Sequence, residues 1–196
     1  MGIDINSYRQ KAAAGTLATS TATGGGGGPA VPEGVFITKI KAAALTPSQK
    51  GEPQLVLDIT VKSVVELTGT LEEGMTEDSV VGREFRMYFL ANAAVENDAK
   101  WGERLIGDVV AISNAVGIDL KKVFADSEGD EAKSIKEIFL NFAQVCTRMI
   151  TKGAEMGNVT VERVRQAKNP KYFNHAIGQG AVEAKAPAKS SATEGL

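Results

Sequence analysis

The sequence predicts an α+β fold that is mainly β, with a flexible tail at each end. Hydrophobic and polar residues alternate in segments before residue 92 and after residue 157, as they do in half-buried strands. Between these segments the hydrophobic residues recur every three or four positions, as on one face of a helix. Both ends of the chain are rich in small residues, which bury too little apolar surface to offset the entropy of ordering.

The 196 residues divide into one folded domain and two tails. Residues 1–31 end in the run GGGGGPAV and are expected to form a flexible Gly/Ala/Thr-rich arm, and residues 181–196 a second flexible tail. Residues 32–180 remain as a single domain of ordinary size. The composition, 43% hydrophobic and 23% charged, is close to the globular average, so a hydrophobic core is attainable.

Three strands are expected in the first half of the domain. EGVFITKIKAAAL (residues 33–45) is rich in β-forming residues, and QLVLDITVKSVVEL (54–67) has a half-buried alternation, so the two form a hairpin or meander around a turn. GREFRMYFLAN (82–92) alternates most strictly of all. Its Phe and Met side chains would face the core, which leaves Arg86 and Tyr88 side by side on the solvent face.

One or two helices and two more strands are expected in the second half. Residues 99–118 show helical spacing and reach Gly117 at a typical C-terminal position, and residues 131–153 form the second helical candidate, with an end that could turn extended. GNVTVERVRQ (157–166) returns to alternation, and NPKYFNHAIG (169–178) supplies a turn and a short last strand. Five short strands with a helix between the third and the fourth fit an OB-like barrel.

The sequence has no motif of a common catalytic site. It contains no P-loop, no GxGxxG after a strand, no GxSxG and no HExxH. With one cysteine (Cys146) and one histidine (His175), a single chain can form neither a disulfide nor a zinc site of the usual ligand count. We expect Cys146 to be an inert core thiol and His175 a packed or surface residue. An enzyme is therefore the lowest-ranked class, and no cofactor is expected.

Acidic segments and hydropathy suggest neither a metal site nor a membrane span. ADSEGDEAK, counted from Asp126, has a glutamate instead of the glycine that a calcium loop needs at position six, so it is predicted to be a solvated loop. No apolar run approaches the roughly 20 residues of a membrane-spanning helix, and no signal peptide is recognisable. We expect a soluble cytoplasmic protein without a membrane partner.

Cations and aromatic residues are interleaved on the expected solvent faces of neighbouring strands. The net charge of −2 argues against a uniformly basic protein, but four cations and one acid between residues 159 and 175 give a local balance of +3. Cations can follow the phosphates of a single strand, and each base stacked on a ring contributes about 1–3 kcal/mol. The alternative to a binding surface is that these strands have ordinary charged outer faces and that Tyr88 or Phe173 packs under a loop. The candidate nucleic-acid-binding residues are Lys39, Lys41, Arg86, Tyr88, Arg163, Arg165, Lys168, Lys171, Tyr172 and Phe173.

The order of several segments carries a resemblance to a known family. PEGVFITKIKAAAL, PQLVLDITV, GREFRMYFL, a helix ending in AVGID, VTVERV and KYFNHAIG follow one another over residues 32–178. This order resembles phage-encoded single-stranded DNA-binding proteins of the OB-fold type and related phage replication and recombination proteins of unassigned function. In such proteins Arg83 would occupy the Gly-Arg position, serving turn geometry or the phosphate backbone.

The resemblance implies a non-catalytic protein that coats single-stranded DNA during phage replication or recombination in the bacterial cytoplasm. Its implied partners are single-stranded DNA, replication or recombination proteins, and further copies of itself. Two features depart from the pattern. The insert at 124–157 is longer than the usual short link, and the C-terminal tail lacks the acidic cluster that recruits replication partners.

A second reading is a structural or assembly protein of a phage virion. A glycine-rich N-terminal arm and a near-neutral net charge would suit contacts with neighbouring subunits as well as they suit a DNA-coating protein. The sequence leaves both readings open.

Overall fold

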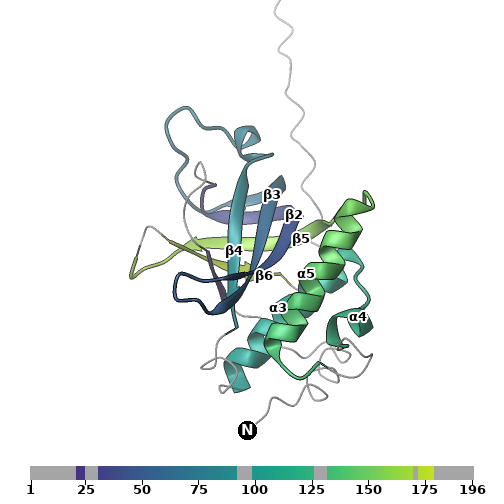
Figure 1. The fold of residues 1–196 in the computed structure, drawn as a ribbon. Helices are drawn as coiled ribbons and strands as arrows, with labels where there is room; N and C mark the ends of the chain where they lie inside the picture. The colour runs from purple at the N-terminus through teal and green to yellow at the C-terminus, as the bar shows by residue number, and fades with distance from the viewer. Residues whose placement is uncertain (1–20, 25–30, 92–98, 126–131, 170–171, 179–196) are drawn as a thin grey trace, which may run out of the picture.

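A computed structural model of the chain describes residues 21–24, 31–91, 99–125, 132–169 and 172–178 (Figure 1). The α+β class, mainly β, is confirmed, and all five predicted strands lie where the alternation placed them. They pair antiparallel in the order β4-β3-β2-β5-β6. The strands are β2 (Gly34–Pro47), β3 (Pro53–Leu67), β4 (Glu84–Leu90), β5 (Gly157–Arg165) and β6 (Phe173–Ile177).

A sixth strand, β1 (Thr21–Gly24), lies in the segment that we expected to be a flexible arm. It pairs with β6 at four register positions but with β4 at only one, Thr23 opposite Tyr88. The five predicted strands alone form an open sheet, and the circuit of strands closes only through β1. The arm prediction is thus wrong for residues 21–24. The rest of the arm up to residue 30, and the tail 181–196, lie outside the described residues.

Removing β1 should therefore open the sheet. In a chain lacking residues 1–24, the backbone groups of β4 and β6 that face β1 lose their partners, and such edges pair readily with other chains. We expect lower thermal stability and concentration-dependent association, measured by size-exclusion chromatography with light scattering. A chain lacking only residues 1–20 keeps β1 and is the matched control. Identical behaviour of the two truncated chains would contradict a closing role for β1.

The described part of the segment between β4 and β5 contains one helix more than the one or two that the sequence predicted. The two expected helices are α3 (Ala99–Val116) and α5 (Ile135–Thr151). The second candidate, 131–153, is helical up to Thr151, so its end does not turn extended. The additional helix, α4 (Leu120–Phe124), is capped by Asp119, whose side chain accepts a hydrogen bond from the Lys121 N–H. A five-residue helix is too short to show a hydrophobic period, which explains why it was missed.

The hydrophobic core joins the buried face of the sheet to the helices. The aromatic rings of Phe89 on β4 and Phe139 on α5 meet edge to face, with centroids 6.4 Å apart. Cys146 lies fully buried in the same core, and burial raises the pKa of its thiol to about 12, as expected of an inert core cysteine. Figure 1 shows the helices gathered on one side of the sheet, while the β5–β6 hairpin extends away from them.

Candidate nucleic-acid interface

Strand β4 has the two faces that its alternation predicts. Phe85, Met87 and Phe89 are buried, whereas Arg86 is exposed and Tyr88 is half-buried on the other face. This outer face continues onto β3 and β2, because the three strands are paired side by side. The sequence therefore placed Arg86 and Tyr88 correctly.

The cations of this outer face are paired with carboxylates. Register sets Asp58 on β3 opposite Arg86, and the Arg86 Nε donates to the Asp58 Oδ1 at 2.6 Å. The Lys41 Nζ donates to the Glu84 Oε1 at 2.8 Å. Each hydrogen-bonded carboxylate raises the pKa of its cation. These four side chains carry no net charge together, so a phosphate would have to compete with two carboxylates for them.

Lys39 and Arg83 lie near this face, but their contacts differ from those of Arg86 and Lys41. Lys39 is exposed on β2, close to the exposed ion pair between Lys62 and Glu155, whose Nζ and Oε1 are 2.8 Å apart. The Arg83 Nε donates to the Ser79 carbonyl at 2.8 Å, which ties the start of β4 to the turn before it. This contact favours the turn-geometry role of Arg83 over a role at the phosphate backbone.

Two candidates on the β5–β6 hairpin do not face solvent, and their placement corrects the sequence analysis. Arg163 is only 6% exposed and Phe173 only 7%. Arg163 follows Val159 and Val161 at alternate positions of β5, and all three side chains point into the sheet interior. The alternate positions that they share along β5, rather than the polarity of arginine, decide that Arg163 lies on the buried face of the strand.

Arg163 and Phe173 form a buried group with Phe85 and His175, here named the barrel-end cluster. The Arg163 guanidinium carbon lies 3.5 Å from the Phe173 ring centroid and 5.2 Å from that of Phe85. The His175 ring stacks on Phe85 with centroids 5.0 Å apart. The Arg163 Nη1 lies 2.8 Å from the His175 Nε2, and its Nε donates to the Val31 carbonyl at 3.0 Å.

Protonation in the barrel-end cluster follows from these contacts. A guanidinium only donates, so the Nε2 of His175 accepts and the ring proton sits on Nδ1, which has no partner among the described residues. Burial, reinforced by the charge of Arg163, lowers the pKa of His175 to about 3. Burial also lowers the pKa of Arg163 to about 10, so at neutral pH Arg163 is charged and His175 is neutral.

The exposed part of the hairpin is here named the hairpin tip and consists of Arg165, Lys168 and Tyr172. Tyr172 is 42% exposed, and Lys168 is exposed in the turn. The guanidinium carbon of Arg165 lies 4.8 Å from the Phe173 ring centroid, and its Nε is 3.6 Å from the Glu33 Oε2. The turn is closed by a hydrogen bond from the Gln166 N–H to the Tyr172 carbonyl at 2.9 Å. Lys171 lies outside the described residues.

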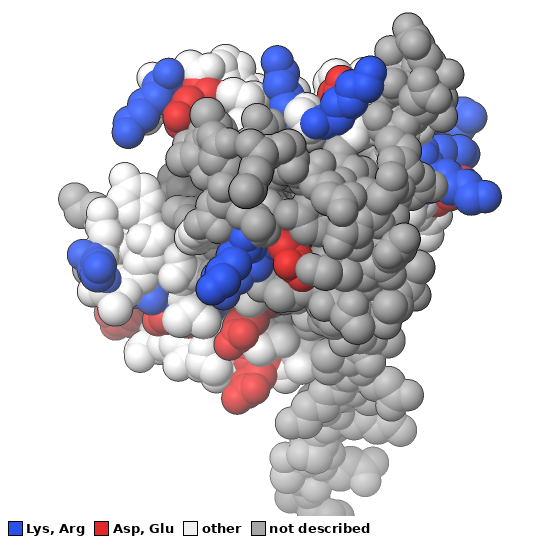
Figure 2. Space-filling view, turned by 90° about the horizontal axis from the view of Figure 1, so that it is seen from below, with Lys and Arg blue, Asp and Glu red and all other residues white. Residues whose placement is uncertain are grey.

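The candidate residues therefore lie in two separate regions of the molecule and do not line a single groove. One is the charge-compensated outer face of β2, β3 and β4, and the other is the hairpin tip above the barrel-end cluster. On the side of the molecule in Figure 2, blue Lys and Arg side chains are likewise dispersed and interspersed with red Asp and Glu. No continuous basic surface connects them in the described part seen there.

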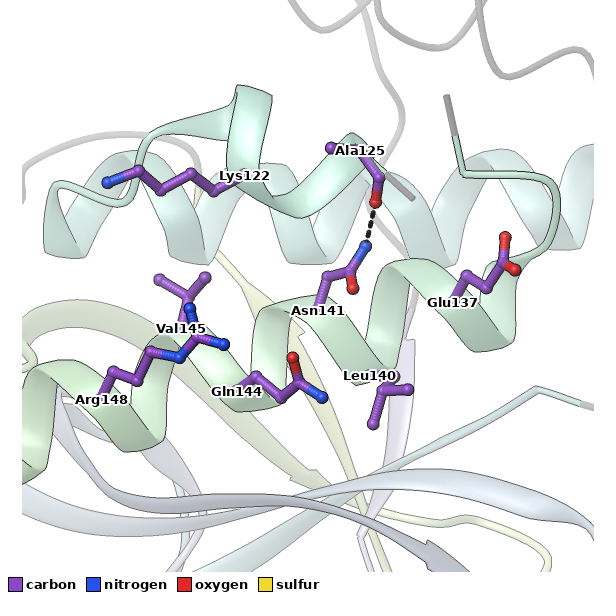
Figure 3. Close-up of a pocket in the computed structure, with 8 residues that line it drawn as sticks. All are labelled: Lys122, Ala125, Glu137, Leu140, Asn141, Gln144, Val145 and Arg148. Carbon is purple, nitrogen blue, oxygen red and sulfur yellow. Dashed lines mark hydrogen bonds between the residues drawn. The ribbon is translucent and has the colours of Figure 1, made fainter. Parts of the chain in front are cut away.

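A groove of about 480 Å³ lies between α4 and α5, away from both groups (Figure 3). The Asn141 side chain crosses it and donates to the carbonyls of Val123, at 3.1 Å, and of Ala125. Side chains of both charges and aliphatic groups line the rest, without convergence on one point. The lining residues are Lys122, Ala125, Glu137, Leu140, Asn141, Gln144, Val145 and Arg148.

Among the described residues, no three His, Cys, Asp or Glu side chains are grouped as a metal site would require. The acidic segment 126–131, predicted to be a solvated loop, lies outside them. None of the described helices combines the length and the hydropathy that crossing a bilayer demands. No protein-family model matches the chain, and neither a curated protein nor a solved structure matches it.

Proposed function

We propose that the chain binds single-stranded DNA without sequence preference, through the hairpin tip. The observation that carries the proposal is the joint exposure of Arg165, Lys168 and Tyr172 on one short hairpin. Cations beside an exposed ring can hold phosphates while a base stacks on the ring. Because Arg165 also lies over the Phe173 ring, its guanidinium is partly oriented before any ligand arrives.

The strand order supports an OB-type barrel as part of this proposal. Numbered without β1, the first strand pairs with the second and the fourth, the second with the third, and the fourth with the fifth, with the helices between the third and the fourth. In OB folds, nucleic acid binds over the second and third strands and at the loop between the fourth and fifth strands. Here that loop is the hairpin tip, and Arg86 and Tyr88 lie on the third strand.

The proposed role is the coating of single strands during phage replication or recombination. Binding by few cations and stacked rings depends little on base identity, as such a role requires. The outer face of β4 would join the contact only where phosphates displace Asp58 and Glu84 from Arg86 and Lys41.

Salt dependence tests the proposal most directly. We expect a fluorescein-labelled oligo-dT to bind in anisotropy titrations, with an affinity that falls as salt rises because neutralised phosphates release counterions. For about two to four phosphate contacts, log K should fall with log[salt] at a slope of about −1.5 to −3. A duplex of equal length is the comparison ligand and should bind more weakly. No binding at micromolar protein, or binding that ignores salt, would contradict the proposal.

Replacement of the exposed ring tests the stacking contribution. We expect Tyr172→Ala to weaken oligo-dT binding by about 1–3 kcal/mol, through the loss of one stacked base, and to leave thermal stability nearly unchanged. Trp101→Ala is the matched control, because Trp101 on α3 is similarly exposed, at 47%. Equal losses from both substitutions would show that the effect does not come from the hairpin tip.

Assembly into a virion is a second candidate function, favoured by the observation that an N-terminal strand completes the sheet. The same strand from another copy would offer the same backbone pairing. Light scattering on the full chain without nucleic acid distinguishes the two functions, since large closed assemblies would favour the second.

A further inference from the structure

The guanidinium of Arg163 is buried, and the carboxylate that acts on its charge, Glu33, contacts Arg165 instead of pairing with Arg163. Among the described residues, no carboxylate forms an ion pair with it. Burying a charge is costly unless it is paired. Its two aromatic neighbours, Phe85 and Phe173, offset part of that cost through cation–π contact but cannot accept its N–H groups in the plane of the guanidinium.

Most of the hydrogen-bonding capacity of Arg163 is unused. A guanidinium has five N–H donors, and in the described structure only two contacts use them, one to the Val31 carbonyl and one to the His175 Nε2. The residue nevertheless keeps 6% of its surface exposed, and none of its side-chain nitrogens is among the fully enclosed polar atoms that lack a partner in the described part of the chain. Planar, forked donors of this kind match the oxygens of a phosphate group.

The surroundings favour a singly charged phosphate over a more highly charged anion. Arg165 lies two residues further along the same strand, and its guanidinium is over the same Phe173 ring as that of Arg163. The nearest carboxylate, Glu33, accepts the Arg165 backbone N–H at 2.7 Å. Two guanidinium groups and one carboxylate leave a local charge of +1, which one phosphodiester or monoanionic phosphate would neutralise.

We propose that Arg163, assisted by Arg165, forms a phosphate-binding site at the end of the sheet between β5 and β6. The phosphate comes either from the backbone of a polynucleotide, in which case the inference rests on the proposed function, or from a free small molecule. The site is pre-organised because Phe85, Phe173, His175 and the Val31 carbonyl fix the guanidinium before a ligand binds.

The chain contains its own reporter for this site. His175 is the only histidine, and its Nε2 accepts a hydrogen bond from Arg163, so its ring nitrogen resonances respond to changes at that guanidinium. The full chain is titrated with inorganic phosphate, and separately with oligo-dT, while the ring is followed by long-range ¹H–¹⁵N correlation. We expect a saturable shift of the Nε2 resonance, and none from sodium chloride at equal ionic strength.

Two variants assign the effect to the proposed residues. Arg163→Lys should abolish the saturable shift, whereas Arg148→Gln, which removes a cation lining the groove between α4 and α5, should leave it intact. If Arg163→Lys fails to fold, Glu33→Gln gives an independent test. It removes the nearest negative charge while keeping the acceptor for the Arg165 N–H, and should tighten phosphate binding about threefold to tenfold.

The two titrations distinguish a free phosphate compound from a polynucleotide backbone. They also distinguish failure of the phosphate site from failure of the proposed function. A shift caused by inorganic phosphate points to a free phosphate compound, and one caused only by oligo-dT points to the backbone. If neither ligand shifts the resonance while anisotropy still detects oligo-dT binding, the phosphate site is overturned and the proposed function stands. A shift that survives Arg163→Lys would also overturn it.

Discussion

Phe89→Ala should lower the free energy of unfolding by about 3–5 kcal/mol, among the largest losses expected from a single substitution in this chain. Phe89 is 1% exposed and meets Phe139 of α5 edge to face, so truncation leaves a cavity where the sheet contacts its main helix. Chemical denaturation followed by far-ultraviolet circular dichroism measures the loss.

A double-mutant cycle with Phe139→Ala isolates the contact between the two rings. Aromatic pairs of this geometry contribute about 0.5–1.5 kcal/mol beyond the area that they bury, so the double variant should lose less than the sum of the single variants. Tyr172→Ala is the surface control and should change stability by less than about 0.5 kcal/mol. Strict additivity would mean that the rings are buried separately, without the predicted coupling.

The strands and the two long helices were predictable because each buries one face. Alternation over five or more residues fixes a strand, and spacing of three and four fixes a helix, whatever the rest of the chain does. Strand β1 lacks this signal, because Thr21–Gly24 has no large apolar side chain and is held by backbone pairing with β6 and β4. Such a strand becomes visible only when the two edges that it joins are known.

The candidate site was predictable in part, for the same reason. Arg86, Tyr88, Arg165 and Tyr172 lie at the surface as expected, but Arg163 does not. A sequence shows which residues share a face of a strand. Arg163 lies at alternate positions with the buried valines of β5, so its position in the strand placed it on the buried face. Its polarity suggested the opposite face, and position prevailed because Phe85, Phe173 and His175 accommodate the cation inside.

The ion pairs on the outer face could not be read from one strand. Asp58 and Arg86 are 28 residues apart, and they meet because β3 and β4 pair in a particular register. The outward parity of Asp58 within QLVLDITV was the available signal. Two adjacent strands that carry opposite charges on the same face are poised to neutralise one another, which reduces the electrostatic attraction of that face for phosphates.

Acidification from pH 6.5 to 5 should destabilise the protein by about 1.5–2 kcal/mol through His175 alone. Burial lowers the pKa of this ring to about 3, compared with an ordinary value of 6.5 in the unfolded chain. Between these two values the unfolded state binds a proton that the folded state does not, so the free energy of unfolding rises with pH. The stability is complete above pH 6.5 and is lost progressively as the pH falls toward 3.

The assignment to one residue is possible because His175 is the only histidine in the chain. Carboxylates titrate mainly below pH 5 and the terminal amine above pH 7, so the interval between pH 5 and 6.5 isolates the imidazole. Denaturant unfolding curves at several pH values give the slope, which should approach 1.36 kcal/mol per pH unit at the acid end of this interval. His175→Gln, which cannot titrate, should have a flat profile there even if its overall stability is lower. A slope that persists in His175→Gln would mean that another group produces it. A flat profile in the unmodified chain would mean that the ring is not buried in its neutral form and that the barrel-end cluster does not hold it against Phe85 and Arg163.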